Sequence, residues 1–340
     1  MQGPSVWVVS DGRAGIENQA RALARALAEP ARAAKLRHIR SDAHRPDPVR
    51  LQPGGPQVLL PPDRWPAPMM SLPAEQRALL APPWPDVWIG SGRRSIPFSR
   101  MVKEWSGGET LVVQTQNPRV DLAPFDLVIP PLHDRLTGPN VFPILGPPTY
   151  FASADVEAAQ ARFHDLVAHA EFKLLVSLGG TSKTHSMNAE RVAWIEQSLK
   201  QLAKRGVRLW ITVSRRTPAA ARTRFRALAE HIGARFWETV DRDGPNPYLA
   251  FLSMCDAALV TEDSANMLLD PAWFAKPIHI MRLDGSSPRF DRLHQDLIDR
   301  GAARWFEGLI DEWSYPPIRE AERAADEIVR LLLRRRPPPG

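Results

Sequence analysis

The chain has 340 residues, of which 44% are hydrophobic and 24% charged, a composition that excludes global disorder and leaves room for two domains of roughly 150 residues each. No apolar run approaches the roughly 18 residues that cross a bilayer, and the first residues lack the pattern of a secretory signal, so we expect a cytoplasmic protein. The single cysteine, Cys255, excludes an intramolecular disulfide and a cysteine-cluster metal site.

The 44 basic and 38 acidic residues give a net charge of +6. This surplus suits phosphate-bearing ligands or an anionic membrane surface. The basic residues do not form the dense stripe, interleaved with aromatic residues, that is typical of nucleic-acid binding. We therefore expect no nucleic-acid partner.

Strands and helices alternate from the N-terminus. An apolar strand at 6–9 is followed by a glycine turn and by a helix with Ala20, Leu23, Ala24 and Leu27 on one face. A second such unit spans 86–105, and short strands follow after residues 110 and 126. Apolar strands that alternate with helices indicate a parallel sheet covered on both faces. The proline-rich stretch 45–70 predicts an irregular excursion, with a helix at 71–80 after it.

A second alternation begins after residue 150. Helices are predicted at 153–170, 188–205, 218–232, 247–254 and 264–275, with strands at 172–180, 208–214, 234–240, 257–263 and 277–283. The predicted fold is α/β, with two Rossmann-like parallel-sheet domains facing across a cleft. We expect residues 1–150 to form the first domain and 151–317 the second. A C-terminal helix at 318–336 would pack back on the first domain.

Ligands of open parallel sheets bind beyond the carboxyl ends of the strands. In the first half, the loop after the first strand holds a group of glycine, charged and amide residues: Asp11, Gly12, Arg13, Gly15, Glu17, Asn18 and Gln19. The pattern is either an anion site at a helix N-terminus or a plain turn and cap. Arg93 and Arg94 after the next strand suit a phosphate or carboxylate, or a solvated helix cap. His133 and Asp134 end a further strand, but adjacent side chains point apart, which predicts no catalytic dyad.

In the second half, three strand ends carry hydroxyl and basic residues. Gly179, Gly180, Thr181 and Lys183 follow one strand, Ser214, Arg215 and Arg216 follow the next, and a rigid loop carries Asn246. Glu262, Asp263 and Ser264 open a helix that also bears Asp270, and we expect Asp263 or Ser264 to cap that helix. The spacing is not that of a P-loop. No metal motif appears, so we expect no tightly bound metal.

Ten segments carry a family resemblance, in this order along the chain: DGRAGIENQ, IGSGRR, QTQNPR, FDLVIPPLHD, GPNV, LGGTSK, TVSRRTP, DGPNPY, TEDSANM and WFEGLIDEWSYPPI. Together they resemble the mitochondrial fission family, the plant "elongated mitochondria" proteins and their bacterial relatives, over nearly the whole chain. The resemblance implies a GT-B glycosyltransferase fold, with a nucleotide-sugar donor held by the second domain.

The chain also resembles the lipid-linked N-acetylglucosaminyltransferase of peptidoglycan synthesis. In that enzyme a helix-borne acidic residue seven positions before a proline holds the donor ribose, and Asp270 before Pro277 occupies this place here. The first loop departs from the family, because relatives have Gly-His-Glu-Asn where this chain has GIEN, with Ile16 in place of the histidine. An inverting transferase of this sequence must therefore use Asp11 or Glu17 as its base.

These observations predict a GT-B-type glycosyltransferase that moves a sugar from a UDP- or GDP-type nucleotide-diphosphate sugar to an acceptor, without a tightly bound cofactor or metal. Its donor would be held by the second-half residues named above, from Gly179 to Asp270. Its acceptor would be held by residues of the first half: Gly12, Arg13, Gly15, Asn18, Gln19, Arg93, Arg94 and His133.

Two other functions remain open from the sequence. One is a non-catalytic adaptor at a membrane surface, which the family name implies for plants, and the other is a sugar-nucleotide epimerase of the same fold. A lipid-linked acceptor would bring the protein to the inner membrane as a peripheral protein. Trp65, Met69, Met70 and the basic tail RLLLRRR are then either membrane contacts or, as the other interpretation, core residues and a solvated end.

Overall fold

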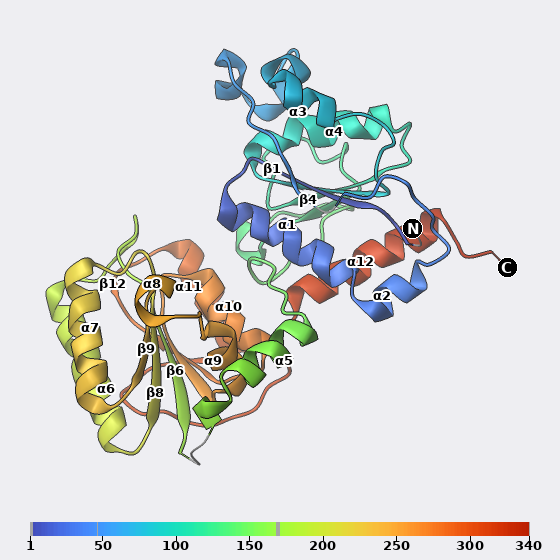
Figure 1. Ribbon diagram of the computed structural model, residues 1–340. Helices are drawn as coiled ribbons and strands as arrows, with labels where there is room; N and C mark the ends of the chain where they lie inside the picture. The colour runs from blue at the N-terminus through green and yellow to red at the C-terminus, as the bar shows by residue number, and fades with distance from the viewer. Residues whose placement is uncertain (1–2, 46, 168–170, 340) are drawn as a thin grey trace. The chain divides into compact units, whose positions relative to one another are not determined.

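The computed structural model describes residues 3–45, 47–167 and 171–339. The chain forms two compact units, one made of residues up to Tyr150 together with those from Arg319, and one made of Phe151–Ile318 (Figure 1). Each unit has its own parallel sheet, which confirms the predicted α/β class with two Rossmann-like sheets. No helix within the described ranges is long and apolar enough to cross a membrane.

The sheet of the first unit has the strand order β2-β1-β3-β4-β5, and every neighbouring pair is parallel. Its strands are β1 (Val6–Ser10), β2 (Val49–Arg50), β3 (Val87–Ser91), β4 (Leu111–Thr115) and β5 (Leu127–Ile129). All residues of β3, β4 and β5 are buried. This agrees with their near-continuous apolar sequences, because a parallel sheet is covered on both faces.

Different helices cover the two faces of this sheet. Val8 packs into the cluster formed with α1 (Ala14–Leu27) and α12 (Glu320–Arg335), and α2 (Pro30–Lys35) contacts α12. Its neighbours Trp7 and Val9 point to the opposite face, where α4 (Ile96–Trp105) and the segment that contains α3 (Ala74–Leu79) complete a second cluster. Successive strand residues thus serve the two cores in turn.

The last helix of the chain completes the first unit. Ala321, Ala324, Ala325 and Ile328 of α12 are fully buried in the cluster that includes α1. Small alanine side chains allow the two helices to approach closely, which explains why α1 and α12 are in extensive contact. Arg32 of α2 donates to Asp326 at 2.8 Å and ties a third helix to the pair.

The proline-rich excursion of the first unit is built from short turns. Three 3₁₀ turns, Pro56–Leu59, Pro62–Arg64 and Pro68–Ser71, each begin on a proline. Proline suits the first position of a helical turn because its missing N–H would have no partner there. The turns lead into α3, and further 3₁₀ turns of this unit lie at Arg93–Ser95 and Leu132–Asp134.

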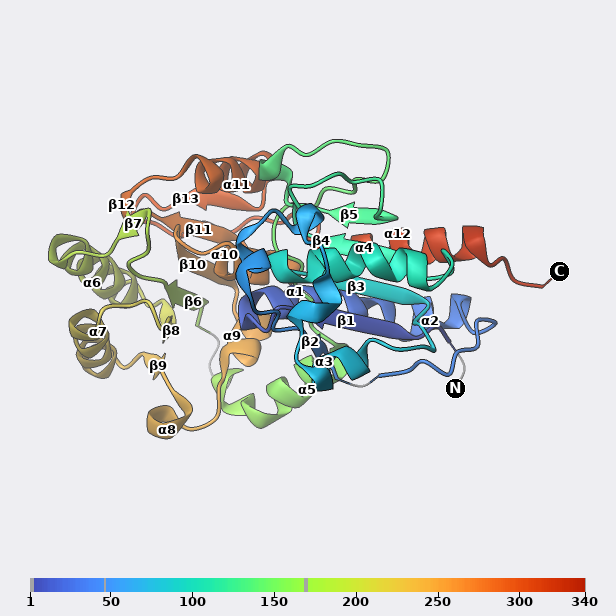
Figure 2. The ribbon, with the colours of Figure 1, turned by 90° about the horizontal axis from the view of Figure 1, so that it is seen from above.

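The second unit has a larger sheet, with the order β13-β11-β10-β6-β8-β9. Its strands are β6 (Lys173–Leu178), β8 (Arg208–Val213), β9 (Arg235–Trp237), β10 (Ala257–Thr261), β11 (Ile278–Met281) and β13 (Ala303–Trp305), all parallel to their neighbours. A separate antiparallel pair joins β7 (His185–Ser186) to β12 (Asp284–Gly285). Figure 2 shows the same strands and helices from above.

The helices of the second unit are α5 (Ser153–Arg162), α6 (Ala189–Lys204), α7 (Ala219–Ile232), α8 (Val240–Asp243), α9 (Tyr248–Met254), α10 (Ala265–Trp273) and α11 (Pro288–Asp299). The helix expected at 153–170 ends at Arg162 and is followed by a 3₁₀ turn, His164–Val167, while 168–170 lie outside the described residues. Helix α11 and strand β13 were not predicted. In α11 only Leu293, His294 and Leu297 are buried, so its apolar stripe is too narrow to be recognised.

We predict that Ile328→Ala in α12 lowers the free energy of unfolding of the first unit by about 2–5 kcal/mol, because it leaves a cavity between α12 and α1. Urea denaturation measures the loss. Arg330→Ala on the exposed face of the same helix is the matched control and should leave stability nearly unchanged. An equal effect of the two substitutions would show that α12 is not part of this core.

Candidate functional site

Both sheets contain a topological switch point, where successive strands are added on opposite sides. In the second unit the chain runs from β6 to β8 and β9 on one side, and then from β10 to β11 and β13 on the other. In the first unit β2 lies on one side of β1, whereas β3, β4 and β5 lie on the other. The loops at such a point diverge and leave a crevice in which α/β proteins bind ligands.

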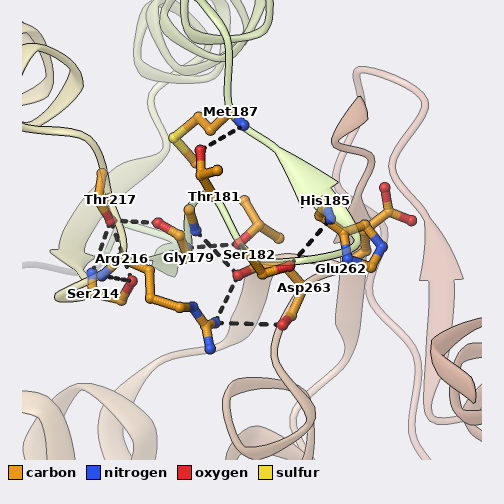
Figure 3. A network of polar contacts seen from close by, with 12 residues as sticks. Gly179, Thr181, Ser182, His185, Met187, Ser214, Arg216, Thr217, Glu262 and Asp263 are labelled. Atoms are coloured by element: carbon orange, nitrogen blue, oxygen red, sulfur yellow. Dashed lines mark hydrogen bonds and ion pairs between the residues drawn. The ribbon is translucent and has the colours of Figure 1, made fainter. Parts of the chain in front are cut away.

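At the switch point of the second unit, Asp263 holds the loop after β6. The Gly180 N–H donates to Asp263 Oδ2 at 3.1 Å, and the Thr261 hydroxyl donates to Asp263 Oδ1 at 2.8 Å. Thr261 Oγ1 in turn accepts the Gly179 N–H at 2.7 Å. Figure 3 shows Gly179, Arg216 and Asp263 within this network. A side chain on Gly179 would overlap the Asp263 carboxylate, so glycine is required for this close approach.

The loop after β8 joins the same network. Thr217 donates through its hydroxyl to the carbonyls of Gly179 and Leu178, and its Oγ1 accepts the Ser214 N–H at 3.0 Å. A side chain on Gly180 would overlap the backbone of Arg216, so this second glycine also permits close contact. The loops after β6 and β8 are therefore fixed to each other by buried hydrogen bonds.

The three predicted cations of this region have different roles. Arg216 donates to Asp263 Oδ2 at 2.6 Å, so its charge is balanced within the protein. Lys183 and Arg215 are exposed on the loops after β6 and β8. Thr181 is also exposed, and its N–H donates to the Arg216 carbonyl at 3.2 Å. The structure thus makes Arg216 a fixed part of the loop and leaves Lys183 and Arg215 at the surface.

Glu262 lies next to Asp263 in sequence but serves another loop. Its carboxylate accepts the Leu283 N–H at 2.5 Å, after β11, and its carbonyl lies 3.0 Å from His294 Nε2. Burial raises the pKa of Glu262, although the hydrogen bond from Leu283 opposes this shift. The Glu262 carboxylate therefore anchors the β11 loop to the β10 loop.

The helix after β10 is not capped as expected. Neither Asp263 nor Ser264 makes a side-chain cap to α10, and the prediction that one of them would do so was wrong. The Asp263 carboxylate accepts hydrogen bonds from Gly180, Thr261 and Arg216 instead of from the first N–H groups of α10. Ser264 occupies the N-cap position with extended backbone.

Asn246 and Asp270 both have partners on α9. Asn246 accepts the Tyr248 N–H at 2.9 Å and so orders the start of this helix. Asp270 on α10 accepts the Tyr248 hydroxyl at 2.9 Å. One carboxylate oxygen of Asp270 is thus committed to a partner within the protein.

In the first unit, Asp11 occupies the switch point. Its side chain is 3% exposed and lies against Gly92 after β3, where any side chain would overlap it. Arg13 donates to Asp11 through Nε at 3.1 Å and Nη2 at 2.7 Å. Gly92 has φ +87°, which favours glycine there for a second reason. The Asp11 carboxylate is thus the group nearest to the position of a Cβ on Gly92, in the turn after β3.

Glu17 is not suited to act as a base. It accepts bonds from Arg50 Nε at 2.8 Å, Arg21 Nε at 3.1 Å and the Ser10 hydroxyl at 2.8 Å. The Arg50 guanidinium chiefly lowers the pKa of Glu17 from 4.5 to about 2, against the opposing effect of burial. So acidic a group is a poor proton acceptor near neutral pH. Glu17 thus ties α1 to β2, and this pairing disfavours Glu17 as the base, which stays a prediction.

Other first-unit residues have local roles that the sequence did not reveal. Arg93 donates to the carbonyls of Val58 at 2.7 Å and Leu60 at 2.5 Å, so it holds the proline-rich excursion and is not free for an acceptor. Gln19 accepts from Gln116 at 3.1 Å. The remaining predicted residues of this unit, Gly12, Gly15, Asn18 and Arg94, are exposed.

His133 and Asp134 differ from the expectation. The prediction that adjacent side chains point apart was wrong, because the 3₁₀ turn Leu132–Asp134 brings His133 Nε2 within 3.6 Å of Asp134 Oδ1. His133 is buried, however, while Asp134 is exposed.

Several residues that build these sites were missed. Thr217, Thr261, Gly92 and Arg50 fix the loops, but none of them was predicted as a site residue. The available signal was that Gly92, Thr217 and Thr261 lie within the segments that carry the family resemblance, at or just beyond the ends of strands. The described residues contain no group of three or more His, Cys, Asp or Glu side chains placed to hold a metal ion.

The comparison with known proteins agrees with the resemblance seen in the sequence. The family model described as mitochondrial fission ELM1 matches residues 14–332. The chain belongs to this family. It is 27% identical to the mitochondrial fission protein ELM1 of Arabidopsis thaliana, over 74% of this chain, and spans 65% of the length of that relative. It is 25% identical to an uncharacterised protein of Rickettsia prowazekii, over 74% of this chain and 80% of the relative.

Two solved structures overlap this family member along almost their whole length. The UDP-GlcNAc 2-epimerase of Methanocaldococcus jannaschii has a TM-score of 0.49 at 11% identity, covering 97% of this chain and 99% of that one. The ADP-heptose LPS heptosyltransferase II of E. coli has a TM-score of 0.45 at 13% identity, with the same two coverages.

We predict that Asp263→Ala lowers the free energy of unfolding by about 2–4 kcal/mol, because the buried Gly180 N–H and the Arg216 guanidinium lose their acceptor. Urea denaturation of the purified variant measures this loss. Asp311→Ala, which removes an exposed ion pair with Arg304, is the control and should change stability little. Comparable stabilities of the two variants would contradict the role given to Asp263.

A second prediction concerns pH. The depressed pKa of Glu17 means that its ionised form stabilises the folded state above about pH 4.5 and that this contribution is lost as the pH falls toward 2. Glu17→Gln should therefore lower Tm by about 3–6 °C at pH 7, with the difference from the natural protein shrinking below pH 4.5. Thermal melts at several pH values test this, and a difference independent of pH would reject it.

Proposed function

We propose that the second unit binds a nucleotide-diphosphate sugar, of UDP or GDP type, at the carboxyl edge of its sheet, and that the protein is a glycosyltransferase. The observation that carries the proposal is the network of Asp263. It fixes the loops after β6 and β8 at a switch point and leaves Thr181, Lys183 and Arg215 exposed beside two glycines. Such loops suit a diphosphate because backbone N–H groups and cations stabilise its charge without reorganising.

In this proposal Lys183 and Arg215 neutralise the diphosphate as it departs, a role that a metal performs in other transferases. Arg216 contributes by holding Asp263, and thereby the loop, in place. The loop around Asn246 would lie beside the nucleobase, and Asp270 or Glu262 would accept from a ribose hydroxyl. Ser214 supports the loop, since its Oγ accepts the Arg216 N–H at 3.1 Å.

The first unit would bind the acceptor through the exposed loop around Gly12, Gly15 and Asn18. Asp11 is the base of the proposal, because Glu17 is held as an anion by Arg50. The Asp11 carboxylate would take the proton of the acceptor hydroxyl. The hydroxyl oxygen of the acceptor would then bond to the sugar carbon, while the bond from that carbon to the diphosphate breaks. Arg13, which is exposed, must turn away from Asp11 for this step.

One observation favours a second candidate, a protein that binds the nucleotide sugar without transferring it, as a non-catalytic adaptor. Ile16 stands where the family resemblance implies a histidine, Glu17 is paired with Arg50, and Asp11 is paired with Arg13. No carboxylate of the described first loop then stands unpaired. Binding and transfer must therefore be measured separately.

Binding is tested by calorimetry with UDP, GDP, CMP and ADP. We expect one of them to bind, and we expect Lys183→Ala with Arg215→Ala to weaken that binding by about 10- to 100-fold, because two charge-assisted contacts are lost. Arg208→Ala is the matched control: Arg208 lies at the amino end of β8, the strand that leads to Arg215, and its side chain is 38% exposed. Equal affinity of the double variant and the control would reject the donor site.

Transfer is tested with the nucleotide sugar whose nucleotide binds. Asp11→Asn should abolish release of the nucleoside diphosphate while leaving nucleotide affinity unchanged, since Asp11 belongs to the first unit. Nucleotide binding without release in the natural protein would instead support the adaptor.

A further inference from the structure

One segment of the first unit exposes several large apolar side chains that the proposed donor and acceptor sites do not use. Eight large apolar side chains are exposed in the described ranges, and four of them lie between residues 59 and 79. We call these four the apolar tip: Leu59, 83% exposed; Leu60, 43%; Met70, 70%; and Leu79, 41%. Single exposed leucines are common on protein surfaces, but here half of the exposed large apolar side chains belong to one short segment.

The apolar tip is held out from the unit by specific contacts. Arg93 donates to the carbonyls of Val58 and Leu60, on either side of Leu59, and Trp65 donates to the Leu60 carbonyl at 3.2 Å. The Gly54 N–H donates to the Ser71 carbonyl at 2.8 Å, next to Met70. Seven prolines between 53 and 73 stiffen the intervening backbone. The exposed side chains therefore stand on a fixed scaffold.

The scaffold lies on the outer side of one helix. The turns Pro62–Arg64 and Pro68–Ser71 both contact α4, and Figure 1 shows α3 and these turns beyond α4, away from the sheet. Trp65 and Leu72 are buried beneath them and act as the anchors of the excursion. One side of Met70 contacts Arg77, whose Nη1 lies 3.8 Å from the Met70 sulfur.

Charge indicates what would cover the apolar tip. The first unit contains 23 basic and 17 acidic residues, whereas the second contains 21 of each, so the whole surplus of +6 belongs to the unit with the tip. Near the tip, Arg64, Arg93 and Arg94 are exposed, against Asp63 and Glu75. The Arg93 guanidinium is bound to carbonyls, so no carboxylate cancels its charge there.

We propose that the apolar tip inserts into the surface of an anionic lipid bilayer, with Arg64, Arg93 and Arg94 at the level of the headgroups. Apolar side chains at the boundary of headgroups and acyl chains, flanked by arginine, are the chemistry by which peripheral proteins bind such membranes. A stable protein complex buries roughly 800 Å² per partner, whereas only four large apolar side chains are exposed in this segment. A bilayer needs no such area.

This assignment differs from the membrane contacts that the sequence predicted. Trp65 is buried, and Met69 packs against the core. In the basic tail, Arg335 pairs with Asp126, and Arg336 pairs with Asp86 and Glu109. Of the predicted contacts, Met70 alone is among the exposed apolar side chains. The inference does not rest on the proposed nucleotide site, because all its residues lie in the first unit.

Sedimentation with vesicles tests the inference on the full chain without nucleotide. The protein should bind phosphatidylcholine vesicles that contain about one-third phosphatidylglycerol, and bind them less at high salt, because salt screens the arginines. Leu59→Ser with Met70→Ser should weaken this binding about tenfold or more. Neither residue is buried, so the thermal midpoint should stay unchanged.

The matched control is Val240→Ser with Leu309→Ser, two exposed apolar side chains of the second unit, 62% and 57% exposed. This pair should bind vesicles as the natural protein does. Absence of vesicle binding, or equal loss in both double variants, would overturn the inference. So would a dimer in solution that Leu59→Ser with Met70→Ser dissociates while vesicle binding persists, because the tip would then be a contact between copies of the chain.

Discussion

The arrangement of both units depends on a buried carboxylate packed against a glycine at the switch point of a parallel sheet. In the second unit Asp263 follows β10 and lies against Gly179 after β6, and in the first unit Asp11 follows β1 and lies against Gly92 after β3. A carboxylate in this place is costly unless it is fully hydrogen-bonded. Each one is satisfied by an arginine, Arg216 or Arg13, and Asp263 also by a backbone N–H and a hydroxyl. The need to satisfy the charge is what fixes the loops.

The same constraint separates the arginines that build the protein from the cations that are free to meet a ligand. The sequence alone does not distinguish these two kinds of cation. Three arginines bind groups of the protein itself: Arg216 pairs with Asp263, Arg50 pairs with Glu17, and Arg93 donates to the carbonyls on either side of Leu59. No such pairing is seen for the exposed Lys183 and Arg215 in the described residues. An arginine on an internal carboxylate contributes no net charge to a bound phosphate, although it sets the shape of the loop that receives it. In the proposed donor site, the cations available to a diphosphate would therefore be Lys183 and Arg215, two side chains on neighbouring loops.

The strands and most helices could be predicted from the sequence because their signals are local. Near-continuous apolar runs predicted β3, β4, β6, β8 and β10, and the sequence also indicated the glycine-bearing turns that follow β1, β3 and β6. The pairing of side chains could not be predicted, since it depends on contacts between residues far apart in the chain. The sequence makes Glu17 a candidate base, but it does not show that Arg50, 33 positions away, pairs with the Glu17 carboxylate. The cap expected from Asp263 fails for the same reason, because Gly180, 83 positions away, competes for its oxygen.

The pairings in the first loop also bear on how the family departure at Ile16 is to be understood. With histidine absent, the loop retains two carboxylates, but they are not equivalent. Glu17 is joined to Arg50 and Arg21 and to a serine, a set of donors that holds the anion firmly. Asp11 has a single cationic partner, Arg13, whose side chain is 61% exposed and is thus free to exchange its bond for water. If the loop performs proton transfer, the physical difference between these two ion pairs assigns the task to Asp11, and the loss of histidine alters the base without removing every candidate for it.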